Sequence, residues 1–282
     1  MADSLLEYTQ PVTHYEQILG RLDQIIEAAY RERSRIGYFA ALYHHVAVAF
    51  GAAIRAGIFE HNDLIQKLDV IFFNRYLEAL GHYLRGHKPT PPWEVAFAAT
   101  ASAQPTVMQH LLLGMNAHIL FDLGIAVAQV CPPAQLPQLE ADFVTMNTVL
   151  GSLVDDMRRD MKRIWPGLDL FERALTPDED GFMGLIVRGG RTLSWEFALA
   201  IAGTSGDEQR ARIVSRARQV ARQSRRFWKP PFPLNIAAGL VRLGELESVR
   251  QTIATLVHRH HVAPNAPFNL RPPQGPRKKI AI

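Results

Sequence analysis

The sequence predicts an all-α fold in which one buried central helix is enclosed by the others. Apolar residues recur at helical intervals of three and four along most of the 282 residues. Strand-like alternation is nearly absent, and the one short candidate runs from Gly184 to Arg188. With 48% hydrophobic and 21% charged residues, the chain has the composition of a globular protein. We therefore expect a single compact helical domain over residues 1–264.

Proline clusters and apolar periodicity set the expected limits of the helices. Pro89, Pro91 and Pro92 predict a loop, and further prolines end helices near residues 132 and 231. The pair Gly189-Gly190 is expected to form a turn. We expect helices at 14–33, 36–57, 62–86, 105–130, 138–165, 192–204, 207–228, 233–243 and 245–260.

The net charge of +4 resides in the C-terminal tail. Arg271, Arg277, Lys278 and Lys279 lie close to the C-terminus, and without them the balance of charges is near zero. The composition therefore gives little support to nucleic-acid binding, and we expect no such partner. Proline and basic residues also replace the apolar periodicity there, which predicts a disordered tail at 265–282.

The cysteine content and the first residues indicate a compartment. Cys131 is the only cysteine, so no internal disulfide can form, which fits a reducing environment. The N-terminal residues lack the basic and apolar pattern of a signal peptide. No apolar run approaches the roughly 18 residues that span a bilayer. We expect a cytoplasmic protein without a membrane span, and the sequence leaves a homodimer open.

The central segment, PTVMQHLLLGMNAHILFDLGIAVAQV, is apolar nearly all round and is expected to be the buried central helix. At about 100° per residue, His110, His118 and Asp122 fall within a third of its circumference, while Asn116 faces away. A glycine in mid-helix costs about 1 kcal/mol against alanine, so Gly114 indicates close approach by another backbone or a ligand.

His118 and Asp122 lie one helical turn apart and can form a carboxylate–imidazole pair. The carboxylate would fix the tautomer of the ring and raise its basicity, as a general base or a metal ligand requires. A catalytic metal usually takes three protein ligands, and Asp69 or His110 could be the third. Three interpretations stay open: a site for a divalent metal ion, an acid–base site, and a polar cluster that only sets the register of packed helices.

The helix expected at 62–86 carries an acid on its apolar face. A buried carboxylate needs hydrogen bonds, a cation or a metal. Asp69 is therefore either a structural carboxylate bonded to nearby backbone amides or a site residue. Asn74, Arg75 and Glu78 are expected to point elsewhere. The apolar face consists of Asp69, Phe72, Phe73, Tyr76, Leu80 and Tyr83.

The stretch GMNAHILFDL, with LDVIFFNRYLEAL upstream and the Trp93 segment between them, resembles a bacterial and fungal family called domain of unknown function 5995. The resemblance covers residues 35–200. It carries no agreed activity, so it supports a fold and a site but not a reaction. It implies site roles for Asp69, Tyr76, Trp93, Asn116, His118 and Asp122, and Asn147 and the Ser194-Trp195 segment look similar too.

Two further segments allow other interpretations. Asp155, Asp156 and Asp160 resemble the aspartate-rich box with which helical isoprenoid cyclases hold magnesium and diphosphate. The interleaved basic residues are instead typical of a solvated, salt-bridged face. The helix at 207–228 carries seven arginines opposite a stripe of small apolar residues. It could touch phosphate or an anionic membrane, but packing against the core is favoured because small residues anchor weakly.

The leading hypothesis is an enzyme that binds a small, largely apolar molecule between helices. His118 would be the acid–base or metal-ligating residue, oriented by Asp122. Asp69 and Tyr76 would face the same cavity, of roughly 300–1,000 Å³. The alternatives are a non-catalytic ligand-binding or interaction protein and, with less support, an isoprenoid cyclase-like enzyme. Candidate substrate contacts are Trp93, Asn116 and Asn147, and candidate metal ligands are His110, His118 and Asp122.

Overall fold

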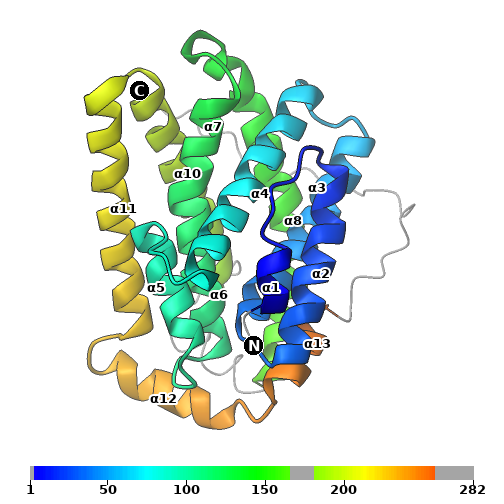
Figure 1. Cartoon of the computed structure of the whole chain (residues 1–282), viewed down its shortest axis with the longest axis vertical. Coiled ribbons are helices and arrows are strands. Elements are labelled where there is room, and N and C mark those ends of the chain that lie inside the picture. Colours follow the sequence, from blue (N-terminus) through cyan, green and yellow to red (C-terminus); the bar gives the residue numbers. More distant parts are fainter. Residues whose placement is uncertain (1–2, 166–180, 258–282) are drawn as a thin grey trace.

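The computed structural model describes residues 3–165 and 181–257, and within these ranges every regular element is a helix. The predicted all-α fold is therefore confirmed, while the predicted tail at 265–282 lies outside the described residues. In Figure 1 most helices run along the long axis of the molecule, and α12 crosses one end of the bundle. The outer helices are α1 (Asp3–Glu7), α2 (Glu16–Glu32), α3 (Ile36–Arg55), α4 (Asn62–Leu84), α5 (Pro91–Thr100), the 3-10 helix η2 (Pro133–Leu139), α8 (Glu140–Ile164), α10 (Gly181–Ala202), α11 (Gly206–Trp228), α12 (Leu234–Gly244) and α13 (Val249–Val257).

The central helix consists of three consecutive segments, α6 (Val107–Ala117), the π-helix η1 (His118–Leu123) and α7 (Gly124–Val130). Nearly all of its side chains are buried, because α3, α4, α5, α10 and α11 pack against it. Figure 1 shows it in the middle of the bundle, between α10 and α11 on one side and α3 and α4 on the other. The expectation of an enclosed apolar helix is confirmed.

A capping box starts the central helix. Thr106 Oγ1 accepts a hydrogen bond from the backbone N–H of Gln109 at 3.1 Å, and Gln109 Oε1 accepts one from the N–H of Thr106 at 2.8 Å. The same Gln109 side chain donates from Nε2 to the carbonyl of Phe227 at 2.7 Å. Gln109 therefore begins one helix and also fixes the end of α11 against it.

The π-helix in the middle of the central helix has an identifiable cause. A π-turn replaces i to i+4 hydrogen bonds by i to i+5 bonds, and side chains that insert into the ladder stabilise such departures. The Ser194 hydroxyl of α10 donates to the carbonyl of Ile119, and Arg216 Nε of α11 donates to the carbonyl of Leu120 at 3.0 Å. Two neighbouring helices thus supply donors to the carbonyls of η1.

Two sequence expectations about local structure are wrong. Pro91 begins α5 instead of prolonging a loop, because proline lacks only an N–H that is unbonded in the first helical turn anyway. The strand candidate Gly184–Arg188 and the expected Gly189-Gly190 turn both lie inside α10. A Cβ at Gly190 would lie only 3.3 Å from Leu120, so glycine allows α10 to pack closely on η1.

By length and composition alone, α3 and the central helix could cross a membrane, although the sequence analysis expected no such segment. Their apolar windows are 72% and 89% buried inside the protein, as in the core helices of a soluble protein. Two such helices are weak support for a membrane span, because their burial already accounts for their apolar composition.

Gly124→Ala is expected to destabilise the protein by roughly 1–3 kcal/mol, because the added methyl group overpacks the contact between α7 and α10. Its Cβ would lie 2.6 Å from the Phe197 ring and 2.9 Å from the carbonyl oxygen of Ser194. Gly20→Ala in α2 is the matched control, since nothing lies within 4 Å of its added Cβ, and it should stabilise by about 0.5–1 kcal/mol. Urea denaturation measures both free energies of unfolding, and equal changes would contradict the close approach of α10.

Candidate functional site

A cavity of about 80 Å³ lies between α3, α4, the central helix and α8. Pockets that take drug-sized ligands measure roughly 300–1,000 Å³, so the expected size is wrong. Of the four residues expected around the cavity, His118 and Asp69 line it, whereas Asp122 and Tyr76 do not. Its other walls are aliphatic and aromatic, apart from the hydroxyl group of Tyr43.

His118 is held in the cavity wall by aromatic rings. It is the first residue of η1 and is 3% exposed. Its imidazole stacks on the Phe72 ring with centroids 3.5 Å apart, and the Tyr43 ring packs edge-on at 4.6 Å. Burial lowers the pKa of His118, although Asp122 opposes that shift, so the ring is neutral at pH 7. Within the described residues, neither ring nitrogen has a hydrogen-bond partner.

Asp69 of α4 and Tyr43 of α3 place two further polar groups on the cavity. Burial raises the pKa of Asp69 to about 7. No hydrogen bond reaches this carboxyl group from any residue that the structure describes. The buried hydroxyl of Tyr43 also lacks a partner there, and burial, with Asp69 nearby, raises its pKa well above the usual value. The apolar cavity therefore holds three polar side chains that these parts of the fold leave unsatisfied.

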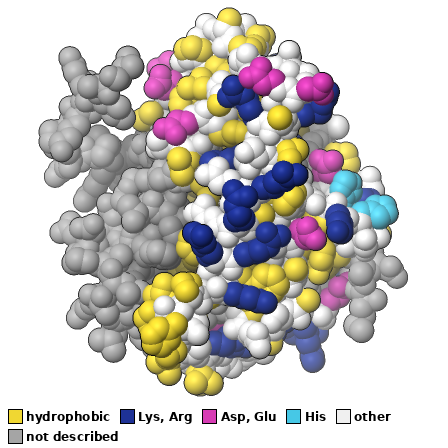
Figure 2. Space-filling model, turned by 90° about the vertical axis from the view of Figure 1, so that its left-hand side faces the viewer, with side chains coloured by type: hydrophobic (Ala, Val, Ile, Leu, Met, Phe, Trp, Pro, Cys, Tyr) yellow, Lys and Arg dark blue, Asp and Glu magenta, His cyan; other side chains and the backbone are white. Residues whose placement is uncertain are grey.

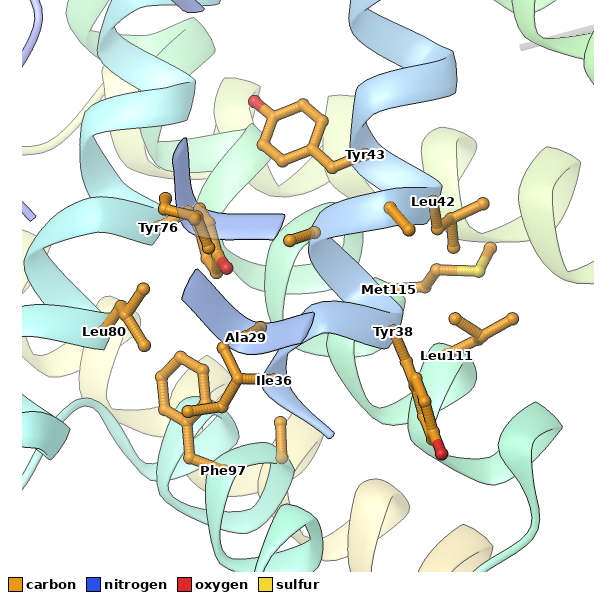
Figure 3. Packing of buried hydrophobic residues seen from close by; sticks show 14 of the residues in the cluster. Ala29, Ile36, Tyr38, Leu42, Tyr43, Tyr76, Leu80, Phe97, Leu111 and Met115 are labelled. Atoms are coloured by element: carbon orange, nitrogen blue, oxygen red, sulfur yellow. The ribbon is translucent and has the colours of Figure 1, made fainter. Parts of the chain in front are cut away.

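Figure 3 shows Tyr43 and Tyr76 among the buried side chains of the core. Tyr76 is fully buried, and its hydroxyl has no partner in the described part of the chain, but its ring packs against Phe39 and Trp93 and not on the cavity. Tyr43 was absent from the predicted site. A hydroxyl group on an otherwise apolar helix face is the signal that would have identified it.

The absence of a side chain at Gly114 makes room for the ring of Phe39, which contacts several buried aromatic side chains. A Cβ at Gly114 would lie 2.3 Å from the Phe39 ring, so the predicted close approach is to a side chain, not to a backbone or a ligand. The Phe39 ring packs edge-on against Tyr76, Trp93 and His118, with centroids 5.4, 5.4 and 5.8 Å apart. The missing side chain at Gly114 thereby fixes an aromatic ring beside the imidazole.

Asp122 is bonded within the fold and does not hydrogen-bond His118. Arg75 Nε donates to its Oδ1 at 2.8 Å, and Trp93 Nε1 donates to its Oδ2 at 2.7 Å. His118 Nδ1 lies 3.6 Å from Oδ2, beyond hydrogen-bond distance. The predicted pair therefore forms as a close contact of ring and carboxylate and not as a hydrogen bond. The expectation that Arg75 points elsewhere is wrong, because its long side chain reaches the central helix.

Residues 15–230 match the group described as "Family of unknown function (DUF5995)". The chain belongs to this family. The resemblance seen in the sequence is thus confirmed, and the match extends beyond 35–200 at both ends. No match is found among curated proteins or among solved structures. Membership of DUF5995 therefore brings no activity to this chain, and the site has to be argued from its own chemistry.

Among the described residues of this DUF5995 member, His110 lies apart from the other predicted metal ligands. His110 precedes His118 by eight residues, about 12 Å along a helix, and its ring faces Tyr38 at 5.6 Å. Burial lowers the pKa of His110 to about 3, so this ring is a neutral core group. In residues 3–165 and 181–257, no three His, Cys, Asp or Glu side chains gather as metal ligands would.

The remaining predicted site residues lie elsewhere. Asn116 is buried outside the cavity, and its Nδ2 has no partner within the described residues. The side chains of Asn147, Asp155 and Asp156 lie outside what the structure describes. Asp160 is only 1% exposed, so the predicted solvated face is wrong at this position, and the cyclase-like alternative gains nothing from it.

Arg75→Met tests the structural role of Asp122. Removing one partner of a buried ion pair leaves a charge unpaired, so the variant should lose roughly 3–5 kcal/mol of its free energy of unfolding. Arg31→Met is the matched control, because the ion pair of Arg31 with Glu27 is exposed and should contribute less than about 1 kcal/mol. Urea denaturation measures both variants. Similar small losses of free energy in both variants would show that the buried carboxylate of Asp122 does not need Arg75 as its charged partner.

Proposed function

We propose that this chain is an enzyme that transfers protons on a small, largely apolar molecule held in the cavity. His118 and Asp69 act as the acid–base pair, and the hydroxyl group of Tyr43 hydrogen-bonds the polar end of the substrate. Asp122, bonded to Arg75, belongs to the framework around His118 and takes no part in the proton transfer.

One observation carries the proposal: two ionisable groups with shifted pKa values and no hydrogen-bond partner in the described residues share an apolar cavity. Asp69, with a pKa of about 7, can both accept and release a proton at neutral pH. The neutral imidazole of His118 offers one N–H donor and one lone pair. An unsatisfied buried polar group costs roughly 1–3 kcal/mol, and such costs are typical of functional sites.

The cavity walls define the class of substrate. An apolar cavity of about 150 Å³ can hold benzene, so a cavity of about 80 Å³ admits a short aliphatic chain or part of a small ring. Met115 and Met146 line the cavity, and flexible methionine side chains can give way to a larger ligand. An alcohol can donate to ionised Asp69 and accept from Tyr43, whereas a carboxylate would be repelled by Asp69.

The second candidate is a non-catalytic ligand-binding protein. The observation that favours it is the 3.6 Å separation of His118 Nδ1 and Asp122 Oδ2. Catalytic and metal-binding histidines usually have a hydrogen-bonded partner that fixes the tautomer. Without one, the polar groups of the cavity would anchor a ligand and leave it unchanged.

Conversion of a small-molecule mixture distinguishes the two candidates. Wild-type protein incubated with short-chain alcohols, ketones and alkenes is expected to deplete one component and form its product, as measured by mass spectrometry. His118→Ala and Asp69→Asn should each slow this conversion about a hundredfold or more. His82→Ala, on α4 but outside the cavity, is the control and should retain the wild-type rate. Thermal stabilisation by an alcohol without any product would favour the ligand-binding candidate.

The pH dependence of stability tests the burial of Asp69 separately. Burial raises the pKa of Asp69 from 3.8 to about 7, so the folded state holds this proton more tightly than the unfolded state. The resulting stabilisation is fully present below about pH 4 and is lost as the pH rises through 7. Asp69→Asn cannot ionise, so it should match the wild type below pH 4 and exceed it above pH 7 by roughly 4 kcal/mol.

Burial also raises the pKa of Glu245 to about 7. Glu245 therefore adds to the loss of stability that the wild type shows as the pH rises. The difference between the wild type and Asp69→Asn, measured by denaturant unfolding at each pH, isolates Asp69. A difference that does not change with pH would contradict the raised pKa.

A further inference from the structure

A stretch of the chain without acidic residues ends in an exposed apolar helix. Residues 209–244 contain eight arginines and one lysine but no aspartate or glutamate. They form most of α11, which runs along one side of the bundle in Figure 1, and all of α12, which crosses its end. The match to DUF5995 ends at residue 230, so α12 lies outside it.

One side of α11 packs on the body of the protein and the other side is cationic. Its small residues Ala217, Val220 and Ala221 are buried, as the sequence favoured. Arg210 and Arg212, near its start, pair with acidic residues one turn before them. Farther along, exposed cations have no acidic partner among the described residues: Arg218, Arg222, Arg225, Arg226 and Lys229.

Large hydrophobic side chains project into solvent from α12 and its flanks. Ile236, Leu240 and Leu243 recur at intervals of four and three residues and therefore share one side of the helix, and Leu243 is 76% exposed. Contiguous apolar surface of this kind marks an interaction site. The exposed set comprises Phe232, Leu234, Ile236, Leu240, Leu243 and Leu246.

The cationic and apolar surfaces lie on the same face of the molecule. Figure 2 looks onto the side that carries α11 and shows basic side chains over the centre of this face, with a hydrophobic patch at its lower edge. Because α12 crosses the end of the bundle in Figure 1 and α11 runs up from it, the cations next to the apolar helix are those at the C-terminal end of α11.

We propose that this face docks on an anionic lipid bilayer. The aliphatic side chains of α12 enter the boundary between headgroups and acyl chains, and the cations at the C-terminal end of α11, among them Arg222, Arg225 and Arg226, meet the lipid phosphates. Apolar side chains and adjacent cations together give the two attachments that stable membrane binding requires. The small apolar side of α11 alone would anchor weakly, and α12 supplies the missing apolar area.

The charge and polarity of this face favour a bilayer over other binding partners. A second copy of the chain would bring two cationic faces together, and the chain's own tail is also basic. An acidic protein would match the charge, but Asn235 and Arg242 are the only polar residues at 232–244. A protein interface typically carries about ten hydrogen bonds, and α12 offers few groups to make them, whereas insertion among acyl chains needs none.

Co-sedimentation of the full chain with lipid vesicles tests this inference, which does not rest on the proposed function. The protein should sediment with vesicles of phosphatidylcholine mixed with phosphatidylglycerol, should not sediment with phosphatidylcholine alone, and should dissociate as salt is raised. The variants Ile236→Ser/Leu240→Ser/Leu243→Ser and Arg222→Gln/Arg225→Gln/Arg226→Gln should each reduce the partition coefficient roughly tenfold or more.

Matched controls change similar residues on other faces. Val144→Ser in α8, where the side chain is 59% exposed, and Arg31→Gln/Lys67→Gln/Lys88→Gln should bind the mixed vesicles as the wild type does. Circular dichroism verifies that each variant is folded, and if the serine variant unfolds, the arginine variant decides the test.

Four results would overturn the proposal. The first is a wild type that does not bind mixed vesicles, and the second is an equal loss in the controls. The third is a loss of binding in Lys278→Gln/Lys279→Gln alone, which would assign the attachment to the tail. The fourth is self-association or binding to an acidic protein that the serine variant abolishes while its vesicle binding is unchanged.

Discussion

The buried carboxylate of Asp122 holds three helices together. Arg75 reaches it from α4 and Trp93 reaches it from α5, at 2.8 and 2.7 Å. A shift of α4 relative to η1 would leave the charge of Asp122 unpaired in a low-dielectric interior, which costs several kcal/mol. A shift of α5 would remove a hydrogen bond from the same carboxylate. His118 lies one turn before Asp122 and owes its position to this framework and to the ring of Phe72, not to a hydrogen bond of its own.

Satisfied and unsatisfied polar groups are separated in this core. The carboxylate of Asp122 receives two hydrogen bonds, whereas Asp69, Tyr43 and His118 receive none from the described residues. Asp122, Tyr43 and His118 are buried and Asp69 is partly buried, so burial alone does not separate the two sets. The distinction lies in the cavity, which leaves space opposite the second set where a ligand's polar atoms would fit. The hydrogen-bonded carboxylate of Asp122 thus lies beside side chains that have no hydrogen-bond partner in the described residues.

The sequence was sufficient for the class of fold and the central helix, because apolar periodicity reports directly on burial. It was insufficient where one residue type serves two purposes. Pro91 was assigned to a loop although proline also starts helices, and Gly190 to a turn although glycine also permits close packing.

The spacing of His118 and Asp122 correctly predicted that the two side chains lie close together. It could not show which residues would hydrogen-bond the carboxylate of Asp122. Arg75 lies on a different helix, and its reach depends on the packing of α4, which no local pattern encodes. The sequence found Asp69 because it stands out on an apolar face, and it overlooked Tyr43 because tyrosine is common on such faces.

The π-helix lets the central helix carry an extra residue while the residues on both sides keep their faces. Relative to an α-helical ladder, η1 accommodates one extra residue between α6 and α7. Deleting a single residue from this segment would restore an unbroken ladder and improve the local hydrogen bonding. Because the wider turn absorbs the extra residue, such a deletion would leave Gly124 facing α10. It would, however, return the carbonyls of Ile119 and Leu120 to the regular ladder, and Ser194 and Arg216 would lose their acceptors.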